Sequence, residues 1–258
     1  MDLWRAALWA LAPALFLLWL FWRRDKWQRE PRLLVLRLFG LGALAAAPVY
    51  FLEAWMPGPA TPVFDNFVRV GLVEELGKFL PFWLFAYRHR EFDEPMDGIV
   101  YAVAAALGFA AVENALYASF AGGTVLVYRT FTSTLAHVGF SGLVGYACGR
   151  AKFMPRGGFL LGARALLAAV ALHGAYNLLL QIGSAPGAPT LVARGTLALL
   201  VPALLLLLTI AARLAEKASP FAQRRESRHA SGSTASETRS IVNATAERPT
   251  WSEPASRR

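Results

Sequence analysis

The stretch LVEELGKFLPFW, residues 72–83, places two glutamates and one lysine in a segment that is otherwise apolar. A charged side chain near the centre of a lipid bilayer costs about 2.5 to 3.5 kcal/mol on insertion scales. If this segment crosses a membrane, Glu74, Glu75 and Lys78 together cost about 8 to 10 kcal/mol. Partners on the same or neighbouring helices must offset that cost. The stretch therefore predicts a membrane helix bundle with a polar interior that serves a function.

The composition of the whole chain agrees with a membrane protein. Of the 258 residues, 56% are hydrophobic and 17% are charged, and the mean hydropathy is +0.41. This composition is too apolar for an ordinary soluble domain. The net charge of +9 comes from basic residues at segment ends and in the tail, which is typical of membrane topology. We therefore expect a lipid bilayer and no nucleic acid as partners.

Seven segments are apolar and long enough to cross a hydrocarbon core about 30 Å thick. They lie near residues 3–22, 33–52, 66–87, 97–119, 128–149, 159–182 and 190–212. Their number and composition predict an all-α, polytopic transmembrane helix bundle over residues 1–217. Residues 218–258 are rich in Ser, Thr, Ala, Arg and Glu, which predicts a disordered basic tail.

The Lys and Arg residues predict an orientation for the bundle. They occur in the first, third and fifth connections and at the start of the tail, for example Arg23, Arg88, Arg150 and Arg213. The even-numbered connections, EAWMPGPATPVFD, SFAGGTVLV and QIGSAPGAPT, contain neither Lys nor Arg. Because cytoplasmic loops carry the basic residues, this pattern predicts a multi-pass protein of the cell membrane with its N-terminus outside and its C-terminus in the cytoplasm.

Four consecutive predicted helices carry polar groups far from their ends. They are Glu74, Glu75 and Lys78; Glu113 and Asn114; His137 and Ser141; and His173 and Asn177. At 1.5 Å per residue, Glu75, His137 and His173 lie about 13 Å from the outer ends of their segments, and Glu113 about 9 Å. The groups therefore fall in one layer and are expected to meet. Arg129 and Arg194 lie near helix ends and are interpreted as ordinary interface residues that extend toward water.

These groups are suited to hydrolysis of an amide bond. A carboxylate in a helix bundle can act as a general base, and imidazole or amide donors can stabilise an oxyanion. No cofactor is required for that chemistry. Two histidines and a carboxylate with an open water position also form a catalytic zinc set, although the usual HExxH motif is absent. Zinc is thus compatible, and its ligands would come from Glu75, Glu113, His137 and His173.

Four motifs occur in the order found in one protease family. EELGK begins at Glu74, Phe109 and Glu113 form an FxxxE pattern, His137 follows, and HGAYN begins at His173. Together they resemble the PrsW family of intramembrane proteases, within the superfamily of CAAX prenyl endopeptidases and bacteriocin-processing proteins. The similarity covers roughly residues 65–180.

The resemblance implies a glutamic-type intramembrane endopeptidase. Glu74 and Glu75 would supply the water-activating base and its partner. The implied site is completed by Glu113, His137, His173 and Asn177, with support from Lys78, Phe109, Asn114 and Ser141. The family is associated with site-1 cleavage of membrane-bound anti-sigma factors, so a membrane-anchored protein is the expected substrate.

Two other classes of function fit part of the pattern. HVGFSGLVG contains GxSG, the nucleophile motif of rhomboid serine proteases, with Ser141 as nucleophile and His173 as base. This hypothesis assigns no catalytic role to Glu74, Glu75 or Glu113. A proton-coupled transporter or a non-catalytic scaffold could also carry buried charges, but the inverted repeats or broken helices typical of transporters are not evident. The sequence does not indicate an oligomeric state.

Overall fold

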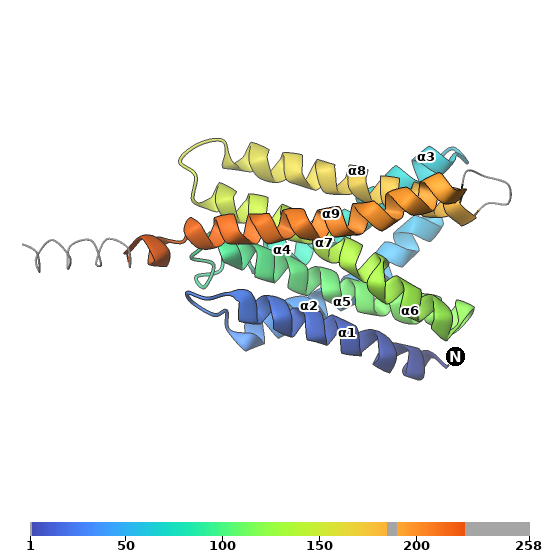
Figure 1. Ribbon diagram of the computed structural model, residues 1–258, viewed down its shortest axis with the longest axis horizontal. Coiled ribbons are helices and arrows are strands. Elements are labelled where there is room, and N and C mark those ends of the chain that lie inside the picture. The colour runs from blue at the N-terminus through green and yellow to red at the C-terminus, as the bar shows by residue number, and fades with distance from the viewer. Residues whose placement is uncertain (1, 185–189, 225–258) are drawn as a thin grey trace, which may run out of the picture. The chain divides into compact units, whose positions relative to one another are not determined.

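The computed structural model describes residues 2–184 and 190–224. Its helical elements are α1 Leu3–Arg24, α2 Arg32–Trp55, α3 Pro62–Phe64, η1 Asp65–Leu72, α4 Val73–Phe85, α5 Pro95–Ala121, α6 Gly123–Phe131, α7 Ser133–Lys152, α8 Gly158–Ser184 and α9 Thr190–Lys217 (Figure 1). No strand occurs in the described residues, which confirms the all-α class. The chain divides into two units, Met1–Ser219 and Pro220–Arg258. In the second unit only residues 220–224 are described, as a short helical turn, so most of the predicted tail lies outside the described residues.

Five helices are long and apolar enough to cross a membrane: α1, α2, α5, α8 and, over Arg194–Lys217, α9. They confirm a polytopic transmembrane helix bundle. The two other predicted segments are not single α-helices. In residues 66–87 the π-helix η1 runs directly into α4, and residues 128–149 contain a junction at Thr132 between α6 and α7. Seven crossings therefore stay a prediction.

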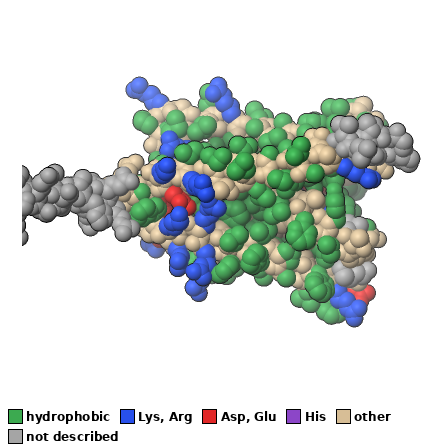
Figure 2. All heavy atoms as spheres, viewed as in Figure 1, with side chains coloured by type: hydrophobic (Ala, Val, Ile, Leu, Met, Phe, Trp, Pro, Cys, Tyr) green, Lys and Arg blue, Asp and Glu red, His purple; other side chains and the backbone are tan. Residues whose placement is uncertain are grey.

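The surface of the first unit separates apolar from basic side chains. Large hydrophobic residues such as Trp9, Phe16, Leu33 and Trp55 are exposed. Figure 2 shows apolar side chains along the middle of the bundle and most of the visible Lys and Arg at one end. Exposed apolar area of this extent suits contact with lipid. The grouping of basic residues agrees with the predicted connections, while the orientation itself stays a prediction.

Helix α5 lies at the centre of the first unit. It packs against α1, α2, α4, α6 and α7, and most of its residues are buried. Small residues permit this close packing. A Cβ atom at Gly108 would lie 1.8 Å from the carbonyl oxygen of Phe39 on α2, so the two helix backbones touch there. The central helix also carries Glu113, and its packing fixes the position of that carboxylate.

The π-helix η1 leads directly into the helix that carries the paired glutamates. Its eight residues, Asp65–Leu72, end one residue before α4 begins at Val73. An ion pair between Arg69 and Asp65 spans one turn of η1. π-Helical segments are rare in proteins and occur often at functional sites. Here the change of helix type comes immediately before Glu74 and Glu75.

Candidate active site

Helix α4 supplies a compact set of three charges. Lys78 Nζ lies 2.6 Å from Glu75 Oε1 and 3.6 Å from Glu74 Oε2. These are the i,i+3 and i,i+4 pairs that the EELGK spacing places on one helical face. All three side chains are at most 5% exposed. The lysine therefore offsets part of the cost of burying two adjacent carboxylates.

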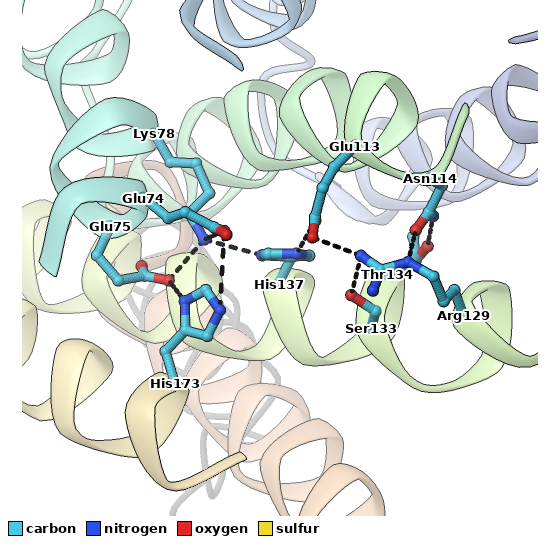
Figure 3. A network of polar contacts seen from close by, with 10 residues as sticks. All are labelled: Glu74, Glu75, Lys78, Glu113, Asn114, Arg129, Ser133, Thr134, His137 and His173. Carbon is cyan, nitrogen blue, oxygen red and sulfur yellow. Dashed lines mark hydrogen bonds and ion pairs between the residues drawn. The ribbon is translucent and has the colours of Figure 1, made fainter. Parts of the chain in front are cut away.

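Two histidines extend this set to α7 and α8, as Figure 3 shows. His173 Nδ1 lies 2.8 Å from Glu75 Oε1, and His173 Nε2 lies 3.7 Å from Glu74 Oε2. His137 Nδ1 lies 2.8 Å from Lys78 Nζ. Their rings meet edge to face with centroids 5.2 Å apart. The predicted convergence of α4, α7 and α8 is thus present in the structure.

Glu113 of α5 joins the cluster through His137. Its Oε2 lies 2.9 Å from His137 Nε2, so each histidine has one ring nitrogen against a glutamate. Because the ammonium of Lys78 can only donate, His137 Nδ1 is the acceptor and Nε2–H donates to Glu113. For His173, a donating Nδ1–H leaves Nε2 as the acceptor on the side of Glu74. Both imidazoles are then neutral and turn an acceptor nitrogen inward.

Arg129 of α6 binds the Glu113 oxygen that does not face His137. Its Nη2 donates to Glu113 Oε1 at 2.5 Å and to Ser133 Oγ at 3.1 Å, and its Nε donates to Asn114 Oδ1 at 2.9 Å. The Asn114 amide in turn donates to Thr134 Oγ1 at 2.7 Å. The interpretation of Arg129 as an ordinary interface residue is therefore wrong. An arginine bound on three sides is a structural part of the cluster (Figure 3).

The remaining predicted residues lie at different distances from this network. Phe109 is beside it, with its ring centroid 5.3 Å from Lys78 Nζ and 6.0 Å from the His137 ring. Ser141 is buried, and its hydroxyl has no hydrogen-bond partner among the described residues. It lines a cavity of about 10 Å³ with Glu75 and Lys78. Asn177 is half-buried on α8 and makes no hydrogen bond to the cluster within the described part of the chain.

A larger cavity reaches the cluster from one side. It has a volume of about 300 Å³ and is lined by apolar side chains of α2, η1 and α5 together with Glu53, Glu74 and Glu113. Glu53 Oε1 is buried without a hydrogen-bond partner among the described residues. The sequence places Glu53 at the end of a span, where a carboxylate in water is the usual expectation. Its role in lining this cavity depends on tertiary packing and had no local indicator.

Comparison with known proteins identifies the family. The model for the PrsW family of intramembrane metalloproteases matches residues 30–209. The chain belongs to the PrsW family. It is 37% identical over 174 residues to the Protease PrsW of Geobacillus kaustophilus strain HTA426, covering 66% of this chain and 77% of that protein.

Other relatives show similar coverage. Identity is 36% over 181 residues to the Protease PrsW of Shouchella clausii strain KSM-K16, covering 67% of this chain and 81% of that protein. Identity is 32% over 175 residues to the Protease PrsW of Bacillus subtilis strain 168, covering 66% of this chain and 80% of that protein. No solved structure matches the chain. Family membership makes this chain an intramembrane protease and confirms the resemblance inferred from its motifs.

The PrsW family is described as metalloproteases, and the cluster contains a set of residues that fits a metal ion. Glu74, His137 and His173 each offer a ligand atom, and these atoms all lie within 4.8 Å of one another. Glu74 Oε2 has no hydrogen-bond partner among the described residues. Hydrogen bonding of each histidine to a second carboxylate is the usual arrangement around metal-binding imidazoles. Glu75 and Glu113, which the sequence proposed as ligands, take this orienting position, and Glu74 is the carboxylate that fits.

Charge balance is compatible with such an ion. Three carboxylates, Glu74, Glu75 and Glu113, face the two cations Lys78 and Arg129. With both histidines neutral, the cluster carries one uncompensated negative charge. A buried charge of this kind is stabilised by a further cation or by a proton.

Proposed function

We propose that this protease hydrolyses a peptide bond of a membrane-anchored protein and that Glu74 activates the attacking water. One observation supports this assignment above the others. Glu74 lines the 300 Å³ cavity, and its Oε2 has no hydrogen-bond partner among the described residues while lying 3.6 Å from Lys78 Nζ and 3.7 Å from His173 Nε2. A buried carboxylate next to an accessible cavity is the arrangement expected of a general base.

The proposed reaction assigns a role to each carboxylate. Glu74 accepts a proton from water while the water oxygen bonds to the scissile carbonyl carbon. The proton then passes to the amide nitrogen as the C–N bond breaks. Glu75 and Glu113 do not take this proton, because each is already bound by a histidine and a cation. They keep the imidazoles in one tautomer and one orientation.

The same site would hold zinc through Glu74, His137 and His173. Glu74 would then be a ligand instead of the general base, and His137 Nδ1 would exchange its hydrogen bond from Lys78 for the ion. A bound zinc ion would supply Lewis acidity that polarises a carbonyl and lowers the pKa of water. The chain contributes the orientation of the ligands through Glu75, Glu113 and Arg129. It also contributes a positive charge at Lys78, next to the place where the carbonyl oxygen becomes negative. Asn177 remains a proposed oxyanion donor.

The cavity indicates how the substrate reaches the site. Its walls are mainly apolar, with Val49, Val70, Leu116 and Phe120 among them. A transmembrane segment of the substrate would place apolar side chains there and present its backbone to Glu74. We propose a membrane-bound anti-sigma factor as this substrate, cut in the outer half of a bacterial cell membrane. The predicted depth of the cluster supports cleavage on that side.

The proposal is tested by comparing membrane proteomes of cells with wild type or Glu74→Gln. A single-span protein should accumulate uncut with Glu74→Gln, because loss of a general base slows the reaction at least about 100-fold. Glu75→Gln and His173→Ala should also lose cleavage while remaining inserted. Glu91→Gln, whose partly exposed carboxylate pairs with Arg90 outside the cluster, is the matched control. Full cleavage by Glu74→Gln would contradict the proposal.

A second measurement addresses the metal. Purified wild-type protein should contain about one zinc ion per chain by elemental analysis, and His173→Ala should contain much less. Chelation should remove activity, and added zinc should restore it. Full activity in metal-free wild-type protein would instead favour the purely glutamic mechanism.

A further inference from the structure

A second group of buried carboxylates lies outside the active site. Asp25 follows α1, Glu30 precedes α2, and Asp97 is in the first turn of α5. Each offers a ligand atom, and these atoms all lie within 4.8 Å of one another. The three residues are between 0% and 3% exposed. Figure 1 shows the α1–α2 connection and the start of α5 at the same end of the bundle.

Four carboxylate oxygens of these three residues lack a hydrogen-bond partner among the described residues. Both carboxylate oxygens of Asp25, Oε2 of Glu30 and Oδ1 of Asp97 make no hydrogen bond among the described residues. Asp97 shows the contrast within one side chain. Its other oxygen, Oδ2, accepts from the backbone N–H groups of Asp93 at 2.8 Å and Glu94 at 2.7 Å, and so caps α5. One oxygen of Asp97 therefore stabilises the helix start, and the other faces the carboxylates.

No ion pair with a described basic residue up to Ser219 neutralises the group. Among the described residues up to Ser219, none forms an ion pair with Asp25, Glu30 or Asp97. Lys152 of α7 is close enough to be attracted by Asp97 and Glu30, but its hydrogen bond goes to the carbonyl oxygen of Phe92 at 2.7 Å. Arg24 and Lys26 pair with Glu216. Three buried carboxylates without a cation would repel one another and carry a large desolvation cost.

Burial and the neighbouring carboxylates also raise the proton affinity of Asp25 and Glu30. Burial raises the pKa of Asp25 to about 8, with Glu94 and Asp97 adding to the shift. Burial likewise raises the pKa of Glu30 to about 11. The nearby backbone N–H of Trp27 acts on the pKa of Asp25 in the opposite direction, although its geometry does not reach that of a hydrogen bond. Independently of these shifts, three buried carboxylates with ligand atoms within 4.8 Å of one another are stabilised by protons or by a metal ion.

We propose that Asp25, Glu30 and Asp97 bind a divalent cation of the Mg²⁺ or Ca²⁺ type. Their ligands are all carboxylate oxygens, which these hard cations prefer, whereas the active-site set contains two histidines. Glu94, which is fully buried and approaches Asp25, provides a fourth carboxylate beside the ion. The unpartnered, 1% exposed Asp25 is the observation that points to a ligand.

The cation would join two parts of the chain. It would attach the α1–α2 connection, through Asp25 and Glu30, to the first turn of the central helix α5. Asp97 and Glu113 are 16 residues apart on α5, or about 24 Å along the helix axis. The ion would therefore act on stability and on the position of α5, and it would not touch the reacting groups. This inference does not depend on the proposed function.

Thermal unfolding tests the proposal. The purified full chain is first treated with EDTA, and its Tm is then measured with and without an excess of MgCl2 or CaCl2. The wild-type Tm should rise by about 5 °C or more at a cation concentration near 100 times Kd. Asp25→Asn should lose this rise, whereas Asp2→Asn, an exposed carboxylate at the other end of α1, should keep it. His173→Ala should also keep it, which separates this site from the active site. Absence of a rise in wild type with either salt would overturn the proposal.

A spectroscopic measurement covers the case in which Asp25→Asn does not fold. Trp22 Nε1 donates to the backbone oxygen of Glu30 at 2.7 Å, so its indole lies close to the proposed ion. Tryptophan-sensitised emission of added TbCl3 should appear with wild type, fall with CaCl2, and be weaker when Trp22→Phe and Trp27→Phe are combined, because both indoles are close to the carboxylates in the chain. Emission that is equal in this double variant, or that CaCl2 does not displace, would contradict a cation bound at these carboxylates.

Discussion

Arg129 lies near a helix end, yet its side chain is only 12% exposed and binds Glu113, Asn114 and Ser133. We predict that Arg129→Gln lowers kcat about 10- to 100-fold with a small change in KM, because Glu113 then no longer holds His137 in place. Arg129→Lys should recover part of the loss through its charge. The matched control is Arg194→Gln, since Arg194 is exposed. Equal effects of the two Gln variants on cleavage would contradict this role for Arg129.

Ser141 tests the rhomboid hypothesis directly. Its hydroxyl has no hydrogen-bond partner among the described residues, and His173 Nδ1 is bound to Glu75 instead. Its cavity of about 10 Å³ has room for one water molecule. We predict that Ser141→Ala slows cleavage less than about 10-fold, far less than loss of a general base. A folded Ser141→Ala variant without activity, or labelling of Ser141 by a fluorophosphonate probe, would favour a serine protease.

The site residues differ in how well the sequence predicts them. Charges in the middle of an apolar helix are costly, so Glu74, Glu113 and His137 could be predicted from cost and depth alone. Glu53 and Arg129 lie near the ends of their helices, where exposure to water is the usual expectation. Only the packing of neighbouring helices buries them. A residue near the end of a span therefore cannot be assigned to the interior without knowledge of its neighbours.

Among the helices, the close contact between α2 and α5 has a direct mutational test. A Cβ atom at Gly108 would lie 1.8 Å from the Phe39 carbonyl oxygen, and nothing lies within 4 Å of a Cβ at Gly40. We predict that Gly108→Ala destabilises the protein by about 1 to 3 kcal/mol, and that Gly40→Ala is neutral or stabilising because alanine favours helix. Thermal unfolding in detergent measures both. Equal Tm values for the two variants would show that α2 and α5 do not touch there.

Hydropathy predicted the order of the helices because apolar length is a local property of the sequence. It did not predict η1, nor the junction at Thr132. Both features occur next to helices that carry site residues, α4 and α7. Apolar length does not report the local helix type, so hydropathy leaves the number of membrane crossings to be measured.

The whole bundle has a predicted topology of seven crossings, with the N-terminus outside. Single cysteines in a Cys148→Ala background, labelled in intact cells with a membrane-impermeant maleimide, test it. Ala60→Cys and Gly123→Cys should label, whereas Glu91→Cys and Met154→Cys should label only after permeabilisation, because basic connections stay cytoplasmic. If only the five helices with long apolar stretches crossed, Ala60 and Glu91 would lie on one side and Gly123 and Met154 on the other. That labelling pattern would contradict seven crossings and the proposed cut in the outer half of the membrane.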